Sequence, residues 1–487
     1  MKTITRDIIS SNFVAVNLTD NRIFEKTEYN KQQLVEKINF WKYVLRYKCK
    51  AKHQESIVIA NQNLDINYFA IIFAAAELSL KIVVIDYIRA DNFHDLEFRD
   101  PKTEVLSPID IFLHDLPTSL EKSNPEGYAK YSFFTKHSNR AYSIYEDLEL
   151  TIDNQDDYNE AISVFPNPED IIIRSTSSGT TNKPKVVEHN HAFINAVSNR
   201  NSSLYDGTAL HVKNLNHGAT AAVTLFPVLI SDAVDKHLIY SIDEDSDLTE
   251  FVDTILEYKD ELTTVSFPYP YLTEKFIKAS KTKNIIWPKL RLVTLSYILE
   301  SVKLAIRDGV FKSITSIFGS NETLGPIFVN IVDKDTWDRD PRYFTEYDKW
   351  YNTRLDEDGK IIVTLPEYNV EATTNDFFKQ EGSYFVHQGR SDMLRINGEH
   401  FELATINKLN KQNQDYYVVA DTLNHCLYLA HWEDKTQDEI DNYVNQVESN
   451  FTRIKIKKVT KLIKNNFYYG IKIDNALLRE YFRTHID

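Results

Sequence analysis

Apolar runs and their spacing divide residues 56–86 into a strand, a helix and a second strand. Residues 56–61, Ser-Ile-Val-Ile-Ala-Asn, form an apolar and β-branched run of strand length. Residues 68–78 place alanines on one face of a helix, and residues 82–86 form another β-branched run. This strand–helix–strand order predicts two parallel strands joined by a right-handed crossover, and therefore an α/β fold.

Three later segments also have the pattern of strands. Residues 171–173 are three isoleucines, and residues 313–317 form a short β-branched run. Residues 453–461 alternate apolar and basic side chains, which predicts a strand with one face in solvent. The basic face is also suited to the phosphates of coenzyme A or to an acidic carrier protein, and the sequence does not separate these two interpretations.

The length, charge and cysteine content limit the class of the protein. Its 487 residues are more than a single compact core usually contains, so we expect two or more domains. Acidic residues outnumber basic ones by 71 to 56, which argues against nucleic-acid or anionic-membrane binding. No apolar run is long enough to span a membrane, and the N-terminus lacks a secretory signal. The two cysteines, Cys49 and Cys426, predict a reduced cytoplasmic protein without a disulfide framework or zinc site.

The segment after the isoleucine run has the composition of a phosphate-binding loop. Residues 177–191 read Ser-Ser-Gly-Thr-Thr-Asn-Lys-Pro-Lys-Val-Val-Glu-His-Asn-His. Small hydroxyl residues and one glycine expose N–H and O–H donors, and the lysines supply positive charge for phosphate oxygens. The P-loop of ATPases is excluded, because it needs a second glycine directly before Lys-Ser/Thr. A polar surface loop is the alternative, and His189 with His191 also suggests a metal pair without a third ligand nearby.

This segment resembles the phosphate-binding signature of the adenylate-forming superfamily, which contains acyl- and aryl-CoA synthetases, peptide-synthetase adenylation domains and firefly luciferase. The resemblance implies a large N-terminal domain, residues 1–388, of parallel-rich sheets flanked by helices with a small β-subdomain. A small, mobile α+β lid domain, residues 389–487, is expected to follow. The residues that match the signature are Ser178, Gly179, Thr180, Thr181, Pro184, Lys185, Val187 and His191, while Asn182 and Val186 replace glycines.

Three further motifs follow in the family's order, and the resemblance assigns roles to their residues. Residues 318–323, Phe-Gly-Ser-Asn-Glu-Thr, are similar to Tyr-Gly-x-Thr-Glu, although alone they are also an ordinary turn after a strand. Residues 374–376 and 389–392 resemble the ribose-binding motifs Thr-Gly-Asp and Gly-Arg-x-Asp. The resemblance thus implies adenine packing by Phe318, a phosphate contact by Asn321, ribose contacts by Asp376 and Arg390, and Mg²⁺ binding by Glu322.

The lid domain is expected to supply the catalytic lysine. Residues 470–479 resemble Gly-Lys-Ile-Asp-Arg-x-x-Leu with one residue inserted, which makes Lys472 the candidate. The alternative is a solvated lysine on the first turn of a terminal helix. The hinge corresponds to Asp392 or Ser391, with Asp392 favoured, and Gly398 matches a glycine beside the thiol tunnel of CoA-using members.

The sequence indicates the acid substrate less clearly than it indicates the nucleotide-binding residues. Residues 214–220 resemble a stretch of acyl- and aryl-CoA synthetases that reaches the acid pocket, so His217 and Gly218 are candidate pocket residues. His217 is equally compatible with a core histidine. Phe267 follows a predicted strand and either lines the pocket or packs beneath it. Members that activate amino acids pair the ammonium group with an aspartate, for which Asp206 and Asp232 are the nearby candidates.

The resemblance implies that a carboxylic acid and ATP form an acyl-adenylate with release of pyrophosphate. An apolar or aromatic acid is favoured, and coenzyme A or a carrier-protein phosphopantetheine is the expected thiol acceptor. Mg²⁺ is the implied metal, and Lys472, Glu322 and Lys185 are the implied catalytic residues. Three alternatives remain: amino-acid adenylation for a carrier protein, a degenerate member that binds nucleotide or acyl-adenylate without turnover, and an assembly component that presents a surface to a partner.

Glycine is scarce in this chain, with 12 residues where average usage would give about 34. The absence of glycine at Asn182, or at Ser79 where the family normally has one, is therefore weak evidence for lost function. The remaining glycines are expected where the backbone approaches another group or needs a positive φ. Those of interest are Gly179, Gly319, Gly389 and Gly398.

Overall fold

The structure is a computed structural model of the 487-residue chain. It describes residues 3–18, 28–60, 64–83, 109–114, 138–144, 147–176, 186–212, 221–242, 247–267, 270–294, 298, 300–320, 322–357, 359–368, 370–390, 393–396, 399–412, 415–421, 426–451, 455–462, 468–469, 472–473, 478–479 and 481–482. No helix in these ranges is long and apolar enough to cross a membrane. Cys49 and Cys426 are buried free thiols.

The contacts within the chain divide it into two units. Unit 1 comprises Met1–Asn352 and Thr364–Ala372, and unit 2 comprises Thr353–Val363 and Thr373–Asp487. The expected boundary between residues 388 and 389 falls in β19 (Tyr384–Arg390), within unit 2. The expectation that a mobile lid domain begins at residue 389 stays a prediction.

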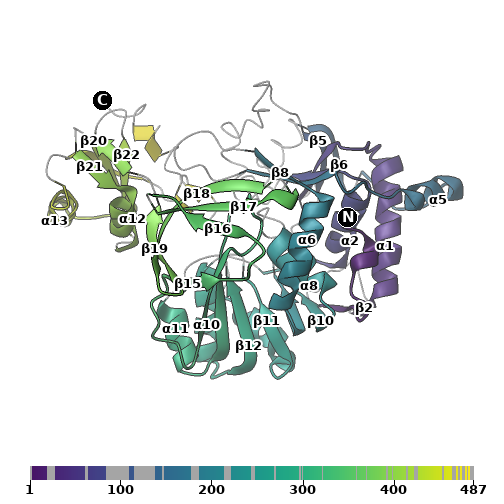
Figure 1. The fold of residues 1–487 in the computed structure, drawn as a ribbon, viewed down its shortest axis with the longest axis horizontal. Coiled ribbons are helices and arrows are strands. Elements are labelled where there is room, and N and C mark those ends of the chain that lie inside the picture. Colours follow the sequence, from purple (N-terminus) through teal and green to yellow (C-terminus); the bar gives the residue numbers. More distant parts are fainter. Residues whose placement is uncertain are drawn as a thin grey trace. The chain divides into compact units, whose positions relative to one another are not determined.

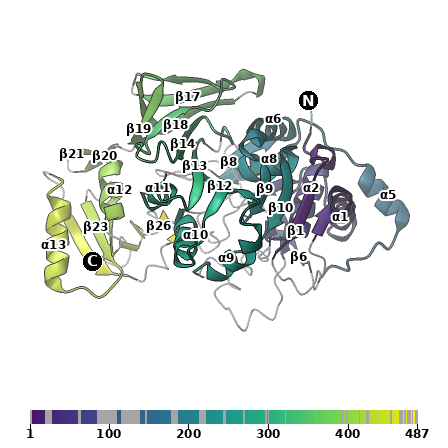
Figure 2. The same ribbon diagram turned by 90° about the horizontal axis from the view of Figure 1, so that it is seen from below.

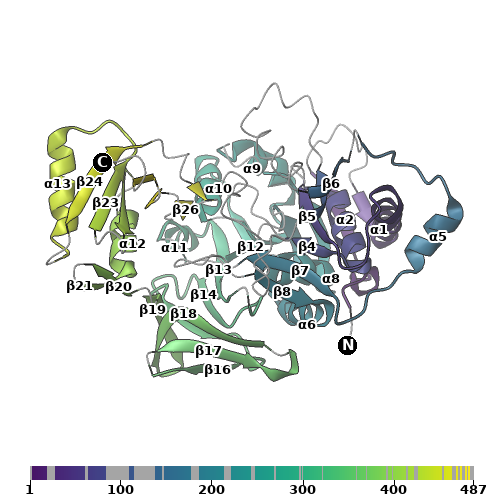
Figure 3. The ribbon, with the colours of Figure 1, turned by 90° about the horizontal axis from the view of Figure 1, so that it is seen from above.

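Unit 1 contains a six-stranded sheet whose centre is parallel (Figure 3). The predicted strand–helix–strand unit is confirmed, because β3 and β4 are parallel neighbours joined through α2. The last strand is antiparallel to its neighbour. In sheet order the strands are β6 (Ser138–Ser143), β5 (Ile109–His114), β3 (Ser56–Ala60), β4 (Lys81–Val83), β7 (Ile171–Thr176) and β8 (Val186–Asn190).

The helix α2 (Ile66–Glu77) shows why an apolar run becomes a central helix. The Asp65 carboxylate caps its first turn and accepts a 3.0 Å hydrogen bond from the Tyr68 amide. Every residue of the helix is buried, and α1 (Lys31–Tyr43) runs beside it (Figure 1). The helix ends at Glu77, and Ser79, which follows the C-cap Leu78, has a φ of 54°, a conformation that favours glycine. This explains why the family has glycine at that position.

Unit 1 also forms nine strands of a second sheet, in which five consecutive neighbour pairs are parallel. Antiparallel strands complete both ends of this run. In order the strands are β2 (Glu28–Asn30), β1 (Val14–Asn17), β10 (Val234–Ile239), β9 (Gly207–His211), β11 (Leu262–Val265), β12 (Trp287–Thr294), β13 (Phe311–Phe318), β14 (Phe328–Asp333) and β15 (Tyr343–Glu346). The run at residues 313–317 lies in β13, as predicted.

Alternation along these strands builds a core on each face of the sheet. Leu292 of β12 packs in one cluster with Phe251 and Phe276, while the adjacent Val293 packs in another with Val228. Successive side chains of a strand point to opposite faces, so neighbours in sequence enter different cores. Figure 2 shows α9 and α10 on one side of these strands and α6 and α8 on the other. The helices are α6 (His191–Asn201), α8 (Phe226–Ile230), α9 (Thr249–Ile255), α10 (Pro270–Thr282) and α11 (Glu300–Arg307), with η5 (Ala221–Leu225) before α8 and α5 (Gln155–Ser163) before β7.

Unit 2 combines β-ribbons with a small α+β core. Leu409 of α12 and Val447 of α13 share a buried cluster with Val418 of the three-stranded sheet. The elements are β16 (Asn352–Leu355), β17 (Lys360–Leu365), β18 (Val370–Glu381), β19, β20 (Met393–Ile396), β21 (Glu399–Glu402), α12 (Leu403–Gln412), β22 (Tyr416–Asp421), β23 (Cys426–His431), α13 (Gln437–Glu448), β24 (Ile456–Lys461), β25 (Tyr468–Tyr469) and β26 (Lys472–Ile473). The predicted alternating strand is β24, and the predicted α/β class of the chain is confirmed.

Candidate functional site

The predicted phosphate-binding segment lies between two strands of the six-stranded sheet. β7 ends at Thr176 and β8 begins at Val186, and these two residues are partners in an antiparallel ladder. This pairing holds the residues on either side of the segment together. The predicted phosphate contacts are Ser178, Gly179, Thr180, Thr181 and Lys185, which lie outside the described residues, so their roles stay predictions.

The histidines at the end of this segment have structural partners. The His191 Nδ1 accepts a hydrogen bond from the Ile4 amide at 3.2 Å, and burial lowers the pKa of His191 to about 4. The His189 ring stacks on Phe193 with centroids 5.1 Å apart. Both histidines therefore serve the packing around α6. In the described part of the chain, no group of three or more His, Cys, Asp or Glu side chains is arranged to hold a metal ion.

The strand β13 presents the second motif at its carboxyl end. Phe318 is the last residue of β13, and its ring is half-buried beside Phe328 and Phe344, with centroids 6.1 and 6.2 Å away. The Ile327 amide donates to the Phe318 carbonyl at 2.8 Å. A tight turn therefore connects Phe318, at the end of β13, to Ile327, just before β14 begins. Asn321 lies outside the described residues.

Hydrogen bonds of Thr323 close this turn. The Thr323 hydroxyl donates to the Ser320 carbonyl at 3.1 Å and accepts from the Ser320 amide, also at 3.1 Å. The Leu324 amide donates to the same carbonyl at 2.9 Å. These bonds fix the backbone on both sides of Glu322, so the turn sets the point from which the Glu322 side chain extends.

Glu322 has the properties of a ligand for a hard cation. Its side chain is half-buried, and it forms no hydrogen bond or ion pair with any residue that the structure describes. Mg²⁺ prefers oxygen ligands and is usually held by one or two carboxylates together with water and substrate phosphates. A single carboxylate without a partner in the described part of the chain fits this mode of binding.

The parallel strands locate the candidate site at one edge of the second sheet. Ligands of open α/β sheets bind outside the carboxyl ends of the strands, and Phe318 lies at such an end. Asp206 and Asp232 precede β9 and β10, so they lie at the amino edge of the same strands. Their carboxylates have other partners, Arg291 at 3.4 Å and Ser10 at 3.0 Å. This position and these partners argue against the interpretation that Asp206 or Asp232 holds a substrate ammonium.

Phe267 follows β11 at the carboxyl edge and packs into the core. It is 5% exposed, and its ring centroid lies 6.2 Å from that of Phe251 and 5.3 Å from that of Phe276. These contacts support the interpretation that it packs beneath a pocket, and direct contact with the acid stays a prediction. The other pocket candidates, His217 and Gly218, lie outside the described residues.

The two residues expected to bind ribose come together in unit 2. Asp376 in β18 and Arg390 in β19 are partners across an antiparallel ladder. The Asp376 carboxylate is 15% exposed and lies 2.9 Å from Nε2 of His387. A carboxylate can only accept, so the His387 Nε2–H donates to it. The pairing of Asp376 with Arg390 supports their shared assignment, and the ribose contact itself stays a prediction.

His387 was not selected by the sequence motifs. The β18–β19 ladder shifts register between Phe377 and Phe378, which separates the Asp376–Arg390 pair from the Phe378–His387 pair. Such a bulge re-aims side chains and is not visible in an alternating pattern. Only the folded ladder therefore brings His387 to Asp376.

Lys472 lies in a short β-ladder. It is the first residue of β26 and pairs with Tyr469 of β25. The alternative that placed it on the first turn of a terminal helix is therefore wrong. Its side chain is outside the described part, as are the hinge candidates Asp392 and Ser391 and the residue Gly398.

Solved structures share this fold along nearly the whole chain. The structure of McyG A-PCP complexed with phenylalanyl-adenylate has a TM-score of 0.68 at 13% identity, and the match covers 99% of this chain and 96% of that one. The o-succinylbenzoate coenzyme A synthetase of Bacillus subtilis, in complex with ATP and magnesium ion, has a TM-score of 0.62 at 13% identity, with 93% of each chain covered. The anthranilate CoA ligase AuaEII in complex with anthranoyl-AMP has a TM-score of 0.63 at 13% identity, with 99% and 98% covered.

No protein-family model and no curated protein sequence matches the chain. The likeness is therefore carried by the arrangement of the elements and not by overall identity. The motifs occur in the order that the adenylate-forming family shows, and both parts of its architecture are covered. The chain thus has the fold of the adenylate-forming superfamily.

Proposed function

We propose that this protein is an ATP-dependent ligase that activates a carboxylic acid as an acyl-adenylate. The observation that carries the proposal is the Glu322 turn, because the Glu322 carboxylate has no partner among the described residues and lies at the carboxyl edge of the sheet, shortly after the aromatic Phe318. The shared fold and the order of the motifs support the same activity.

The first reaction joins the acid to the nucleotide. A carboxylate oxygen attacks the α-phosphorus of ATP, the bond between that phosphorus and the bridging oxygen breaks, and pyrophosphate leaves. The acid is already ionised, so no general base is needed. Catalysis then consists of holding the two reactants in line and offsetting negative charge.

Each predicted residue has one of these tasks. The segment with Ser178, Thr180, Thr181 and Lys185 holds the β- and γ-phosphates, and Glu322 holds Mg²⁺. When bound, the metal offsets charge on the phosphates. Asp376, oriented by the hydrogen bond from His387, and Arg390 hold the ribose. Lys472 interacts with the carboxylate and α-phosphate oxygens as they react.

The second reaction transfers the acyl group to a thiol with release of AMP. Coenzyme A and a carrier-protein phosphopantetheine present the same thiol, and the exposed basic side chains Lys457 and Lys461 of β24 suit either the phosphates of the former or the acidic surface of the latter. An apolar or aromatic acid is favoured, because Phe267, with its aromatic neighbours Phe251 and Phe276, follows β11 at the carboxyl edge, where we expect the acid to bind. Two of the similar structures are complexes with aromatic adenylates, phenylalanyl-adenylate and anthranoyl-AMP.

The decisive experiment is ATP–pyrophosphate exchange with pools of fatty, aryl and amino acids. The wild-type protein should exchange in at least one of the fatty or aryl pools. Lys472→Ala should lower the rate about 10²–10³-fold, as expected when a transition-state charge contact is lost. Lys455→Ala is the matched control, because Lys455 pairs with the Glu448 carboxylate on the same unit and should leave exchange unchanged.

The other outcomes are equally informative. Nucleotide binding without exchange in any pool would overturn the proposal in favour of a degenerate binding protein. Exchange confined to the amino-acid pool would leave adenylation standing and overturn the acid class. Equal rates for Lys472→Ala and Lys455→Ala would overturn the assignment of the catalytic lysine.

A further inference from the structure

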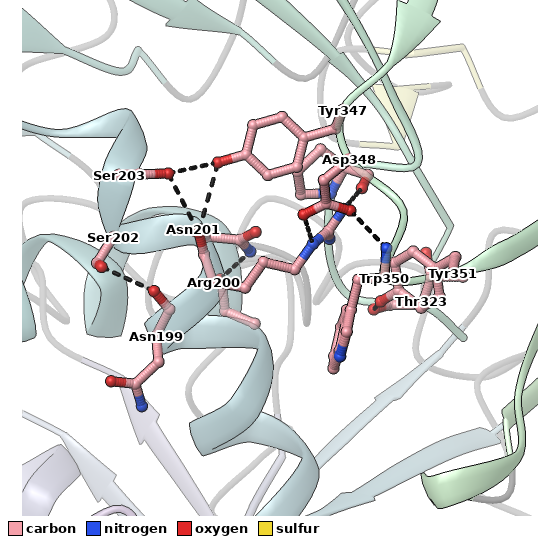
Figure 4. Close-up of polar contacts among 12 residues, drawn as sticks. Asn199, Arg200, Asn201, Ser202, Ser203, Thr323, Tyr347, Asp348, Trp350 and Tyr351 are labelled. Atoms are coloured by element: carbon pink, nitrogen blue, oxygen red, sulfur yellow. Dashed lines mark hydrogen bonds and ion pairs between the residues drawn. The ribbon is translucent and has the colours of Figure 1, made fainter.

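Arg200 occupies an enclosed site at the end of α6 (Figure 4). Its Nε and Nη2 donate to the two oxygens of Asp348 at 2.6 and 2.7 Å, and Nη2 also donates to the Pro326 carbonyl at 2.7 Å. The Arg200 side chain is 9% exposed. Its guanidinium carbon lies 4.7, 5.1 and 4.9 Å from three ring centroids, those of Tyr347, Trp350 and Tyr351.

The backbone that Arg200 contacts belongs to the turn that carries Glu322. Pro326 lies in the segment that returns from this turn to β14. Beside it, a Cβ atom on Gly325 would lie 3.0 Å from Val197 and 3.1 Å from Asn201, so α6 packs directly against the glycine. On the other side, the Tyr351 hydroxyl donates to the Thr323 carbonyl at 2.6 Å. Residues 323–326 are therefore held between α6 and the aromatic segment 347–351.

The same helix is connected to the predicted phosphate-binding segment. α6 begins at His191, immediately after β8, and β8 is the strand that follows that segment. Phe193 in the first turn of α6 stacks on His189 of β8, and its ring also lies parallel to that of Trp350, at 6.3 Å. One rigid helix thus joins β8 to the turn that carries Glu322, with Arg200 at its far end.

We propose that Arg200 is a positioning residue that sets the place of the Glu322 carboxylate relative to the phosphates of the nucleotide. The proposal rests on the proposed function, because it assigns Glu322 to the metal. Three features of the guanidinium serve this role: a planar fork that matches the Asp348 carboxylate, a further donor for the Pro326 carbonyl, and flat faces that stack on the rings. A lysine offers a single ammonium and cannot make this set of contacts.

The structural half of the proposal is tested without any reaction. In Arg200→Lys, backbone amides of residues 319–327 should exchange hydrogen at least about tenfold faster than in the wild type, because the Asp348 and Pro326 bonds are lost. Arg291→Ala is the matched control: Arg291 donates to the Leu204 carbonyl at 2.6 Å in the same unit and forms no hydrogen bond with the described residues of the segment 319–327. Unchanged exchange in Arg200→Lys, or an equal change in Arg291→Ala, would overturn the positioning role.

The functional half is tested by the metal dependence of pyrophosphate exchange. Arg200→Lys should raise the Mg²⁺ concentration for half-maximal exchange about tenfold and lower the maximal rate about 10²-fold, since misplaced charge contacts lose catalysis steeply. The KM for the acid should stay within about twofold, because Arg200 is proposed to act on the metal ligand and not on the acid. Tyr351→Phe removes only the bond to Thr323 and should shift the Mg²⁺ dependence in the same direction by a smaller factor.

These outcomes separate the two proposals. A wild-type protein that exchanges with no acid contradicts the proposed function, while hydrogen exchange still decides whether Arg200 holds the turn. A wild-type protein that is active, with a Mg²⁺ dependence unchanged in both Arg200→Lys and Tyr351→Phe, contradicts the further inference alone. A rise in the KM for the acid that equals the shift for Mg²⁺ would indicate general loosening of the fold and would also overturn it.

Discussion

The Gly319 α-carbon faces the carbonyl oxygen of Gly325 so closely that a Cβ atom on Gly319 would lie 2.2 Å from that oxygen. The two glycines close the turn that carries Glu322, and no rotation of a side chain could relieve the contact, because the obstacle is backbone. In a chain that retains few glycines, this position shows one reason for retention: close approach of two backbone segments.

Gly319→Ala should therefore destabilise unit 1 by about 3 kcal/mol, at the upper end of the effect of overpacking. The turn must open to admit the methyl group, so pyrophosphate exchange should fall as well. Denaturant unfolding measures the first effect. Gly309→Ala is the control, because Gly309 has φ of 73° and nothing within 4 Å of its Cβ position, so only the backbone strain of about 1 kcal/mol is expected. Equal losses for the two variants would contradict the role of the Gly325 contact.

The bond between His387 and Asp376 should matter for nucleotide binding. His387→Leu removes the donor at 2.9 Å and leaves the carboxylate free to turn, so the KM for ATP should rise about tenfold with little change in stability. His387→Gln keeps a donor and should recover most of the affinity. A KM for ATP in His387→Leu that equals the wild-type value would show that Asp376 needs no orientation.

Two stacked histidines should make the stability of unit 1 depend on pH. His211 Nε2 and His237 Nδ1 lie 3.0 Å apart, and burial lowers the pKa of His211 to about 3 and that of His237 well below its usual range. Both rings are neutral in the folded protein near pH 6, whereas the unfolded chain takes up protons below about pH 6.5. Stability is therefore present above about pH 6.5 and is lost as the pH falls through the range between the unfolded and folded pKa values.

The expected loss between about pH 7 and pH 5.5 is about 1 kcal/mol for each of these histidines, or about 2 kcal/mol for the pair. Denaturant titrations at both pH values measure it. His211→Gln removes one titrating ring and should lower the pH dependence by about 1 kcal/mol, while His237 and the buried His191, whose pKa is also lowered, keep their contributions. The same difference between the two pH values in the wild type and in His211→Gln would contradict the assignment.

Substitutions at Ser79 should separate the effect of backbone strain on stability from the effect of a side-chain hydrogen bond. Its hydroxyl donates to Asp170 at 2.6 Å, but its φ of 54° is strained for any residue with a Cβ atom. Ser79→Ala and Ser79→Gly both lose the bond, and only glycine relieves the strain. We therefore expect Ser79→Gly to be more stable than Ser79→Ala by about 1 kcal/mol in denaturant unfolding.

Ser202 is the matched control for this comparison. It also ends a helix in unit 1, but its φ is −59°, a right-handed conformation. There Ala should be more stable than Gly, because glycine gains freedom in the unfolded chain. A preference for glycine at both positions would show that the effect at Ser79 does not come from its left-handed backbone.

The sequence by itself determined several helices and strands and the order of the candidate binding motifs along the chain. The apolar run of α2 and the β-branched runs of β3, β7 and β13 are local patterns, and a buried parallel strand or central helix needs little more than such a run. The turn after β13 was also predicted, since Gly319 and the polar residues that follow it form a compact local unit. These features depend on neighbours in the chain, which is why the sequence was sufficient.

Only the tertiary structure decided which distant residues meet. Asp206 and Asp232 were plausible partners of a substrate until the parallel order of β9 and β10 placed them at the amino edge of the sheet. Arg200 and Asp348 lie far apart in sequence, and neither belongs to a motif. Their fork of hydrogen bonds exists because α6 and the segment after β15 pack on the same turn. Alternation and spacing describe one segment at a time, whereas such contacts depend on strand order, ladder register and the packing of separate segments.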